Sequence, residues 1–345
     1  MHEVDIGVQL VPGGPREIVR QAIDAESLGF RSVWIADHLF GAGRDRDWPV
    51  PEIVATLGAV AMATQRIRIG TCVLSLLKRD PALVAHSSLT LAELSNGRFD
   101  LGVGTGFGPD LRAFGIDLAH PAARLEESLE VIRALFGSGV DTPVSHDGTR
   151  FHLQDAFLNV PGVTPPPIYV ASIGPRTLDI TARLGDGWLP FGLTPSIYSE
   201  YLSAIRPERA DFVPGIWIPA FIQRQGVDAS AEAEAAGRLY LSMAPNVLRS
   251  LAPGVEVASS MSATSWTESG ARQLAESIPP DVARGVVLWG SPEDLIDQIL
   301  GFIRSGCRRF VVGIKDNERR GADLELLARE VLPYVGDVGL AAKGD

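Results

Sequence analysis

The 345-residue chain has 42 acidic and 31 basic residues, a formal net charge of −11, and 46% hydrophobic residues. These values describe an ordinary globular protein. They argue against nucleic acid and against an anionic membrane surface as partners, because an acidic chain without a basic cluster is repelled by both. With only two cysteines, Cys72 and Cys307, neither a disulfide framework nor a structural zinc site is expected.

Short apolar runs rich in β-branched residues alternate with longer segments of helical period. In the first such pair, the helix begins near Pro15 and ends at Leu28 and Gly29, where glycine suits a left-handed cap. Strands are predicted over residues 4–10, 32–37, 67–75, 99–105, 168–172, 187–191, 216–222 and 310–314. Helices are predicted over residues 15–28, 51–64, 81–94, 124–136, 175–185, 292–306 and 324–335.

The order of these elements predicts a (β/α)8 TIM barrel. Strands that are apolar on both faces and mostly separated by helices indicate a parallel sheet covered by helices, and eight of them suffice to close a barrel. A barrel needs only about 250 residues, so insertions are expected in the loops at the carboxyl ends of the strands. They are placed at about 141–166 and at about 225–283, the latter between strands seven and eight. No linker divides the chain, so residues 1–345 are expected to form one domain. An open doubly wound sheet is the alternative.

The segment RFDLGVGTGFG, residues 98–108, is rich in glycine. A dinucleotide-binding fingerprint needs glycine at its first, third and sixth positions. Counting from Gly102 the sixth residue is Phe107, and counting from Gly104 it is Pro109, so the fingerprint is not met. The residues that follow are expected to form an irregular loop. In a barrel this segment would end a strand at the catalytic face, where glycines let a flat ligand approach the backbone.

The segment WIADHLF places Asp37 and His38 at the carboxyl end of the second predicted strand. Barrel enzymes carry their chemistry at this end of their strands. Neighbours in a strand point to opposite faces, so both side chains reach the lumen only if the strand ends or bulges between them. The position favours a catalytic pair, and a loop histidine beside a structural carboxylate is the alternative. No histidine or cysteine spacing indicates a metal site.

A second candidate site follows the run at 168–172. Ser172 ends that run, and Gly174 and Pro175 begin a helix whose free N–H groups face the catalytic rim. Such a helix start binds anions such as phosphate, although a plain capped helix start is the alternative.

In this order, the segments resemble the luciferase-like superfamily of flavin and deazaflavin barrels. The resemblance covers about residues 5 to 335, except the stretch near 225–283. The Asp-His pair, GTCVLS and GPRTLDITARLGDGW are similar to the branch that uses coenzyme F420, with methylene-tetrahydromethanopterin reductases, glucose-6-phosphate dehydrogenases and phthiodiolone ketoreductases. Five segments carry the resemblance to the superfamily: ESLGFRSVWIADHL, RIRIGTCVLSLLKRDPALVAHSSLTLAELSNGRFDLGVGTG, RLEESLEVIRALF, PPIYVASIGPRTLDITARLGDGWLP and GSPEDLIDQILGFIRSGCRRFVVG.

The resemblance implies an F420-dependent oxidoreductase that transfers a hydride between C5 of the deazaflavin and a small to medium organic substrate with a carbonyl, imine or activated double bond. It implies that His38 handles the proton on the substrate and that Asp37 contacts the deazaflavin ring. A cis peptide bond is implied between Cys72 and Val73, behind the ring. The residues implied to bind the cofactor are Asp37, Cys72, Val73, Thr105, Gly106, Ser172, Ile173, Gly174 and Arg176, the last four at the phosphate of its tail.

The cofactor decides the reaction, because a deazaflavin favours hydride transfer and reacts poorly with oxygen. With FMN in the same place, the protein would be a monooxygenase that uses reduced FMN and oxygen, and this is the principal alternative. A non-catalytic binder on the same barrel is another.

The substrate is a small molecule, and its pocket is expected to be more apolar than a sugar-phosphate site. In the sugar-phosphate dehydrogenases of the resembling branch an acidic residue follows the G-T-G segment, whereas Phe107 and Gly108 follow it here. Phe40, Trp48 and Phe107 are the candidate aromatic wall. The resemblance further implies a homodimer. The start of the chain lacks the pattern of a signal peptide and no long apolar segment occurs, so a cytoplasmic protein without a membrane span is expected.

Overall fold

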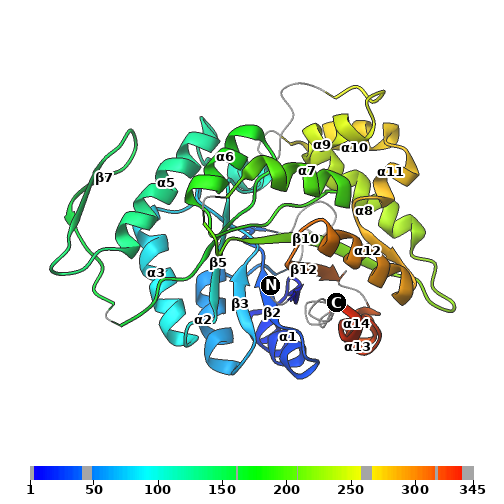
Figure 1. Ribbon diagram of the computed structural model, residues 1–345, viewed down its shortest axis with the longest axis horizontal. Helices are drawn as coiled ribbons and strands as arrows, with labels where there is room; N and C mark the ends of the chain where they lie inside the picture. The colour runs from blue at the N-terminus through cyan, green and yellow to red at the C-terminus, as the bar shows by residue number, and fades with distance from the viewer. Residues whose placement is uncertain are drawn as a thin grey trace, which may run out of the picture.

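The computed structural model describes residues 4–40, 49–160, 162–207, 209–257, 266–314 and 318–335. Eight parallel strands form its central ring, and each pairs with the next until the last pairs with the first. In order around the ring they are β1 (Asp5–Gln9), β2 (Ser32–Ile35), β3 (Arg68–Thr71), β5 (Phe99–Gly104), β8 (Ile168–Val170), β9 (Gly187–Trp188), β10 (Val213–Ile222) and β12 (Arg309–Ile314). Helices surround this ring (Figure 1), so the predicted TIM barrel is confirmed.

The third barrel strand is divided into two parts. After β3 the peptide bond between Cys72 and Val73 is cis, as the resemblance implies, and β4 (Leu74–Ser75) then continues the strand by pairing with β5. The Cys72 N–H still donates to the carbonyl of Ile35 at 2.7 Å, so the segment stays attached to β2. The strand predicted over residues 67–75 is therefore present, with an interruption at the catalytic end.

Local sequence explains where the main helices begin. Proline occupies the first turn of α1, α3 and α12 (Pro15–Ser27, Pro81–Leu94 and Pro292–Arg304), where its missing N–H costs nothing. The carboxylate of Asp80 caps α3 by accepting from Ala82 N at 2.8 Å. No helix in the described part of the chain combines the length and apolar character needed to cross a membrane. The other helices outside the insertion are α2 (Ile53–Ala63), α4 (Gly108–Ala113), α5 (Pro121–Phe136), α6 (Pro175–Leu184), α7 (Pro195–Ile205), α13 (Arg320–Glu330) and α14 (Leu332–Val335).

Several elements were not predicted. The strand β11 (Leu288–Gly290) pairs with the end of β10 and lies outside every predicted strand and helix. Its three residues are too few to establish a period. The strands β6 (Val144–Asp147) and β7 (His152–Ala156) form an antiparallel hairpin inside the expected insertion at 141–166, and it projects from the barrel at the left of Figure 1. The hairpin leads into β8 and does not follow a barrel strand, so the expected place of this insertion at the carboxyl end of a strand is corrected. The helix α7 was not predicted either, although Thr194 caps its start by accepting from Ile197 N.

The long segment between β10 and β11 is mostly helical. In the described part of the chain it contains α8 (Ser230–Met243), α9 (Pro245–Leu251), α10 (Glu268–Ser277) and α11 (Pro280–Arg284). The helix α8 packs against both strands, and α10 and α11 pack against α8. These helices form a group at the upper right of Figure 1. The segment is thereby attached to the rim of the barrel.

Strand residues alternate between the helical layer and the barrel lumen. On β2, Val33 and Ile35 join the large core formed with the helices, whereas Trp34 belongs to an inner cluster with Tyr169 and Val311. The rings of Trp34 and Tyr169 meet edge to face, with centroids 5.9 Å apart. The lumen is therefore packed at mid-height.

The amino-terminal end of the barrel is closed by charged side chains. Arg309 lies 2.9 Å from Asp100 and 3.0 Å from Asp5, and Arg68 makes a second pair with Asp100 at 2.6 Å. The Arg309 guanidinium also lies 4.7 Å from the centre of the Tyr169 ring. An open pocket of about 650 Å³ borders this network. In barrels this face serves stability rather than chemistry.

The glycines of β5 make room for protein rather than for a ligand. A Cβ atom at Gly102 would lie 2.0 Å from the carbonyl oxygen of Thr71, and one at Gly104 would lie 3.0 Å from the side chain of Val73. The interpretation that these two glycines admit a flat ligand is therefore corrected. They allow the interrupted third strand to pack closely beside β5.

Candidate functional site

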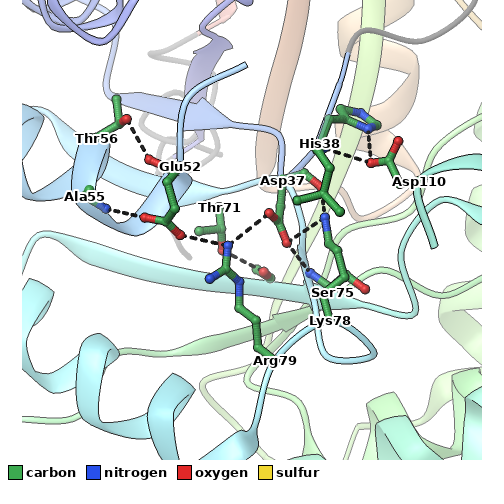
Figure 2. Close-up of polar contacts among 12 residues, drawn as sticks. Asp37, His38, Glu52, Ala55, Thr56, Thr71, Ser75, Lys78, Arg79 and Asp110 are labelled. Atoms are coloured by element: carbon green, nitrogen blue, oxygen red, sulfur yellow. Dashed lines mark hydrogen bonds and ion pairs between the residues drawn. The ribbon is translucent and has the colours of Figure 1, made fainter. Parts of the chain in front are cut away.

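Asp37 and His38 follow β2 and point in different directions. The strand ends at Ile35, two residues before the pair. Figure 2 shows the Asp37 side chain directed toward Ser75, Lys78 and Arg79, and the His38 side chain directed toward Asp110. The alternation of faces thus continues past the end of the strand and separates the two side chains.

Asp37 is part of the framework of the site. Its Oδ2 accepts from Ser75 N at 3.0 Å and pairs with Lys78 Nζ at 3.1 Å, while its Oδ1 pairs with Arg79 Nη2 at 3.2 Å. Lys78 also donates to the Asp37 carbonyl. The Asp37 side chain is only 2% exposed. Both carboxylate oxygens therefore have partners inside the protein, and the implied contact of Asp37 with a cofactor ring stays a prediction.

Asp37→Asn is expected to lower the free energy of unfolding by about 1–3 kcal/mol. The amide keeps the volume and still accepts from Ser75, but Lys78, whose side chain is 5% exposed, loses its negative partner. Urea denaturation measures the change. Asp179→Asn is the control, because Asp179 is 66% exposed in its pair with Arg183 and should cost less than about 0.5 kcal/mol. Equal losses in both variants would contradict the framework role of Asp37.

His38 is held by a buried carboxylate. Its Nδ1 lies 3.0 Å from Oδ2 of Asp110, and the same oxygen accepts from Leu39 N at 3.2 Å. The His38 side chain is 36% exposed, whereas that of Asp110 is 1% exposed. Thus one edge of the imidazole is fixed by the protein and part of the ring reaches the surface of the site.

The helix α4 carries Asp110 and corrects the expectation of an irregular loop after β5. It begins at Gly108, has Pro109 in its first turn, and ends at Ala113. Six residues are too few to show a helical period, which explains why the pattern did not predict it. Asp110 lies in the first turn, where a negative charge suits the helix dipole.

An aromatic ring packs against His38, and further aromatic pairs involve nearby residues. The Phe107 ring meets the imidazole edge to face at 5.9 Å between centroids, and Trp266 contacts Phe107 at 5.2 Å. Trp266 comes from the long segment between β10 and β11 and is 6% exposed. Phe40 stacks on Phe114 at 6.3 Å. Of the three predicted wall residues, Phe107 thus packs beside His38, and Phe40 follows His38 by two positions in the chain.

Trp48, the third predicted wall residue, lies outside the described residues. The pairing of Phe107 with Trp266 still ties the long insertion to the site. Arg112 of α4 strengthens this connection by donating to the Trp266 carbonyl.

Ser75 connects the Asp37 framework to the loop after β5. Its hydroxyl donates to the carbonyl of Thr105 at 3.1 Å, while its N–H donates to Asp37. Gly106 follows with a φ of +86°, and a Cβ there would lie 2.3 Å from the Ser75 hydroxyl. Thr105 and Gly106 are therefore placed beside β4, as one continuous wall at the carboxyl end of the barrel.

Cys72 and Val73 lie half-buried in the same wall. Both pack against the inner cluster that contains Trp34. Burial raises the pKa of the Cys72 thiol, so this surface is neutral and apolar. In the described part of the chain, no group of three or more histidine, cysteine, aspartate or glutamate side chains is arranged to hold a metal ion.

The expected phosphate residues divide into two groups. The hydroxyl of Ser172 is buried and bonded to Thr181 Oγ1 at 2.7 Å, and its expected contact with a ligand stays a prediction. Ile173 is half-buried and packs against the main core. Gly174 is the N-cap of α6, and its N–H donates to Thr177 Oγ1 at 3.3 Å.

Arg176 is the member of this set best placed to meet an anion. Its side chain is 62% exposed at the first turn of α6 and lies 3.4 Å from Glu126. Glu126 also pairs with Arg183. The guanidinium and the amino-terminal N–H groups of α6 therefore offer positive charge at one point of the surface, partly offset by this carboxylate.

A comparison with known proteins assigns the family. The description of that family is luciferase-like monooxygenase, and it matches residues 2–309, most of the chain. The chain belongs to the luciferase-like family. The resemblance inferred from the motifs is thereby confirmed.

Two curated relatives of this luciferase-like chain match over most of their lengths. It is 31% identical over 335 residues to an F420-dependent glucose-6-phosphate dehydrogenase of Amycolatopsis mediterranei, covering 94% of this chain and 96% of the relative. It is 30% identical over 334 residues to a phthiodiolone/phenolphthiodiolone dimycocerosates ketoreductase of Mycobacterium kansasii, covering 86% and 91%.

Solved structures support the luciferase-like fold. An F420-dependent secondary alcohol dehydrogenase, solved with an F420-acetone adduct, superposes with a TM-score of 0.77 at 22% identity, covering 96% of this chain and 99% of that one. An EDTA monooxygenase from Chelativorans sp. BNC1 gives a TM-score of 0.71 at 18% identity, covering 98% and 94%. At these identities the likeness concerns the fold alone.

Several residues of this luciferase-like site were missed from the sequence. Lys78 and Arg79 lie three and four residues after a predicted strand end, and two adjacent cations there were a usable indication of a nearby carboxylate. Asp110 lies in a segment that was predicted to be an irregular loop, so it was not recognised as a partner of His38. Trp266 lies in the stretch near 225–283, where neither period nor resemblance is informative.

Proposed function

We propose that this protein is an oxidoreductase that uses coenzyme F420 to transfer a hydride to or from a small or medium organic substrate with a carbonyl, imine or activated double bond. The observation that carries the proposal is His38, half-exposed at the carboxyl end of β2 and bonded to buried Asp110. The name of one curated relative states dependence on F420, and the names of both, a dehydrogenase and a ketoreductase, support an oxidoreductase.

The residues present fit a flat ring with an anionic tail. The neutral, half-exposed surface of Cys72 and Val73 suits the face of a deazaflavin, with Thr105 and Gly106 beside it. A cation at the start of α6 suits a phosphate, and Arg176 is exposed there. In this proposal Asp37 supports the ring site from behind, by fixing the segment that begins at Ser75.

When bound, F420 would supply or accept the hydride at C5 of its deazaflavin ring. His38 then transfers the proton: it donates to the carbonyl oxygen during reduction and accepts from the hydroxyl during oxidation. Phe107 packs against the imidazole and limits its movement.

The substrate we propose is apolar near the reacting group and carries no phosphate. The described ring neighbours of His38 support this, since Phe107 contacts it directly and Trp266 packs on Phe107. The name of one relative states glucose-6-phosphate dehydrogenase activity. We expect uncharged ketones, imines and enones to be better substrates for this chain than a sugar phosphate.

An FMN-dependent monooxygenase is the second candidate. The description of the family as luciferase-like monooxygenase favours it. The two candidates differ in what they consume, because a monooxygenase uses oxygen in step with product, whereas an F420 enzyme would exchange a hydride between cofactor and substrate without oxygen.

A side-by-side titration with F420 and FMN tests the cofactor. The protein has six tryptophans, whose fluorescence reports binding. We expect tight binding of F420 and weak binding of FMN, followed by turnover of ketones, imines or enones with reduced F420. Tight FMN binding, together with oxygen consumption that matches product, would instead establish the monooxygenase. Binding of a cofactor without any redox change would indicate a non-catalytic binding protein.

We also propose that residues 1–345 form one domain and that the protein acts in the cytoplasm as a homodimer. Met62 on α2 and Leu83 on α3 are 65% and 68% exposed, and they provide apolar surface for contact between subunits.

A further inference from the structure

We propose that Asp110 is a positioning residue that keeps His38 in the tautomer with the proton on Nδ1, so that Nε2 is the atom that exchanges a proton with the substrate. This inference rests on the role of His38 in the proposed function. It adds to that function a second residue and a defined atom.

The contacts of Asp110 make it an acceptor toward His38. Its Oδ2 receives the backbone N–H of Leu39 at 3.2 Å, and a backbone N–H can only donate. The same oxygen lies 3.0 Å from Nδ1 of His38. The other oxygen, Oδ1, is buried and has no hydrogen-bond partner among the described residues. The acceptor capacity of this carboxylate is therefore directed at Leu39 and His38.

An acceptor at Nδ1 decides the position of the imidazole proton. A neutral imidazole has one N–H and one lone pair, so an Nδ1–H donated to Asp110 leaves the lone pair on Nε2. Asp110 is 1% exposed, so water does not replace it as the partner. The side chain of His38 is 36% exposed, and Asp110 binds its Nδ1 edge. The Nε2 edge is therefore the one left for a substrate.

A second histidine–aspartate pair in the chain provides a contrast. On the β6–β7 hairpin, Nδ1 of His152 lies 2.9 Å from Oδ1 of Asp147, a nearly identical distance. Those side chains are 64% and 98% exposed. Water competes for both partners there, so the pair does not hold one tautomer. Burial of the carboxylate, rather than the distance, distinguishes the pair at the site.

The proton transfer balances with this assignment. During reduction of a ketone, the Nε2–H bond of the imidazolium breaks as the O–H bond of the alcohol forms, and the hydride on carbon comes from the reduced deazaflavin of the proposed function. The imidazolium becomes a neutral imidazole that retains Nδ1–H and its bond to Asp110. Oxidation of an alcohol reverses each change.

The test uses the full chain with 15N-labelled histidine, studied without cofactor at about pH 8.5, above the usual imidazole pKa. Long-range 1H–15N NMR spectra distinguish protonated from unprotonated ring nitrogens, and His38→Gln assigns the His38 resonances among six histidines. We expect His38 to carry its proton on Nδ1. In Asp110→Asn this preference should be lost, because the amide N–H₂ can donate to Nδ1. Asp147→Asn is the matched control and should leave the His38 spectrum unchanged.

Turnover adds an independent readout. Asp110→Asn should lower kcat by about ten- to a hundredfold, with F420 binding retained, and Asp147→Asn should leave kcat unaltered. A wild-type spectrum with the proton on Nε2 of His38 overturns the inference, and it does so even if the Asp110 variant fails to fold. If His38→Gln keeps full turnover, the proposed function of His38 fails whatever the tautomer, so the two failures are distinguishable.

Discussion

His38→Ala is expected to lower the turnover of a carbonyl substrate with F420 by about a hundredfold or more, as loss of a general acid or base does. His38 is the half-exposed imidazole held at the carboxyl end of β2 by buried Asp110. Binding of F420 should change little, because the residues proposed to hold the ring and its phosphate lie on other strands and on α6. Steady-state kinetics and the fluorescence titration measure the two effects separately.

His152→Ala is the control for this prediction, because His152 pairs with an aspartate at a similar distance but on the exposed hairpin. It should leave turnover unchanged. His38→Gln tests whether loss of fold explains the effect, since the amide can still donate to Asp110. Wild-type turnover in His38→Ala would refute the proposed proton transfer.

Asp100→Asn is expected to lower the free energy of unfolding by about 3–5 kcal/mol, since it removes one partner from a buried ion network. Asp100 is fully buried and contacts both Arg68 and Arg309. Burial by itself lowers the pKa of the Arg309 guanidinium, but the charges of Asp100 and Asp5 outweigh this effect and raise it. An arginine guanidinium is not deprotonated in proteins, so Arg309 stays charged in the variant, with Asp5 as its remaining carboxylate. Urea denaturation measures the loss.

Asp211→Asn is the matched control, because Asp211 lines the same pocket near Arg209 but is 74% exposed. Its replacement should change stability by less than about 0.5 kcal/mol. Folded Asp100→Asn protein should retain its turnover, because the network lies at the amino-terminal face of the barrel. A stability loss no larger than that of the control would show that the network contributes little.

Much of the barrel was predictable because its elements are encoded locally. The eight predicted strands all appear in the ring, as β1, β2, β3 with β4, β5, β8, β9, β10 and β12. Apolar runs and proline or glycine at element ends depend on residues within a few positions of one another. Where the stretch was short, as in α4 and β11, the same reasoning did not predict the element.

The site was predicted less completely, because its partners are distant in the chain. His38 and Asp110 are 72 residues apart, and Asp37 lies about 40 residues from Ser75, Lys78 and Arg79. The motif correctly located the carboxyl end of β2. It did not indicate that Asp37 would be buried in a charged framework while His38 reached the surface of the site.

By itself, the sequence determined the barrel, the order of its strands and the end at which Asp37 and His38 lie, since these depend on local period and on the parallel direction of the strands. Only the tertiary structure decided which groups those residues meet. Asp110 reaches His38 because α4 begins directly after β5, and Trp266 reaches Phe107 because the long insertion packs back on the rim. Hydrogen bonds and ring contacts act over a few ångströms, so they depend on how distant segments pack rather than on spacing along the chain.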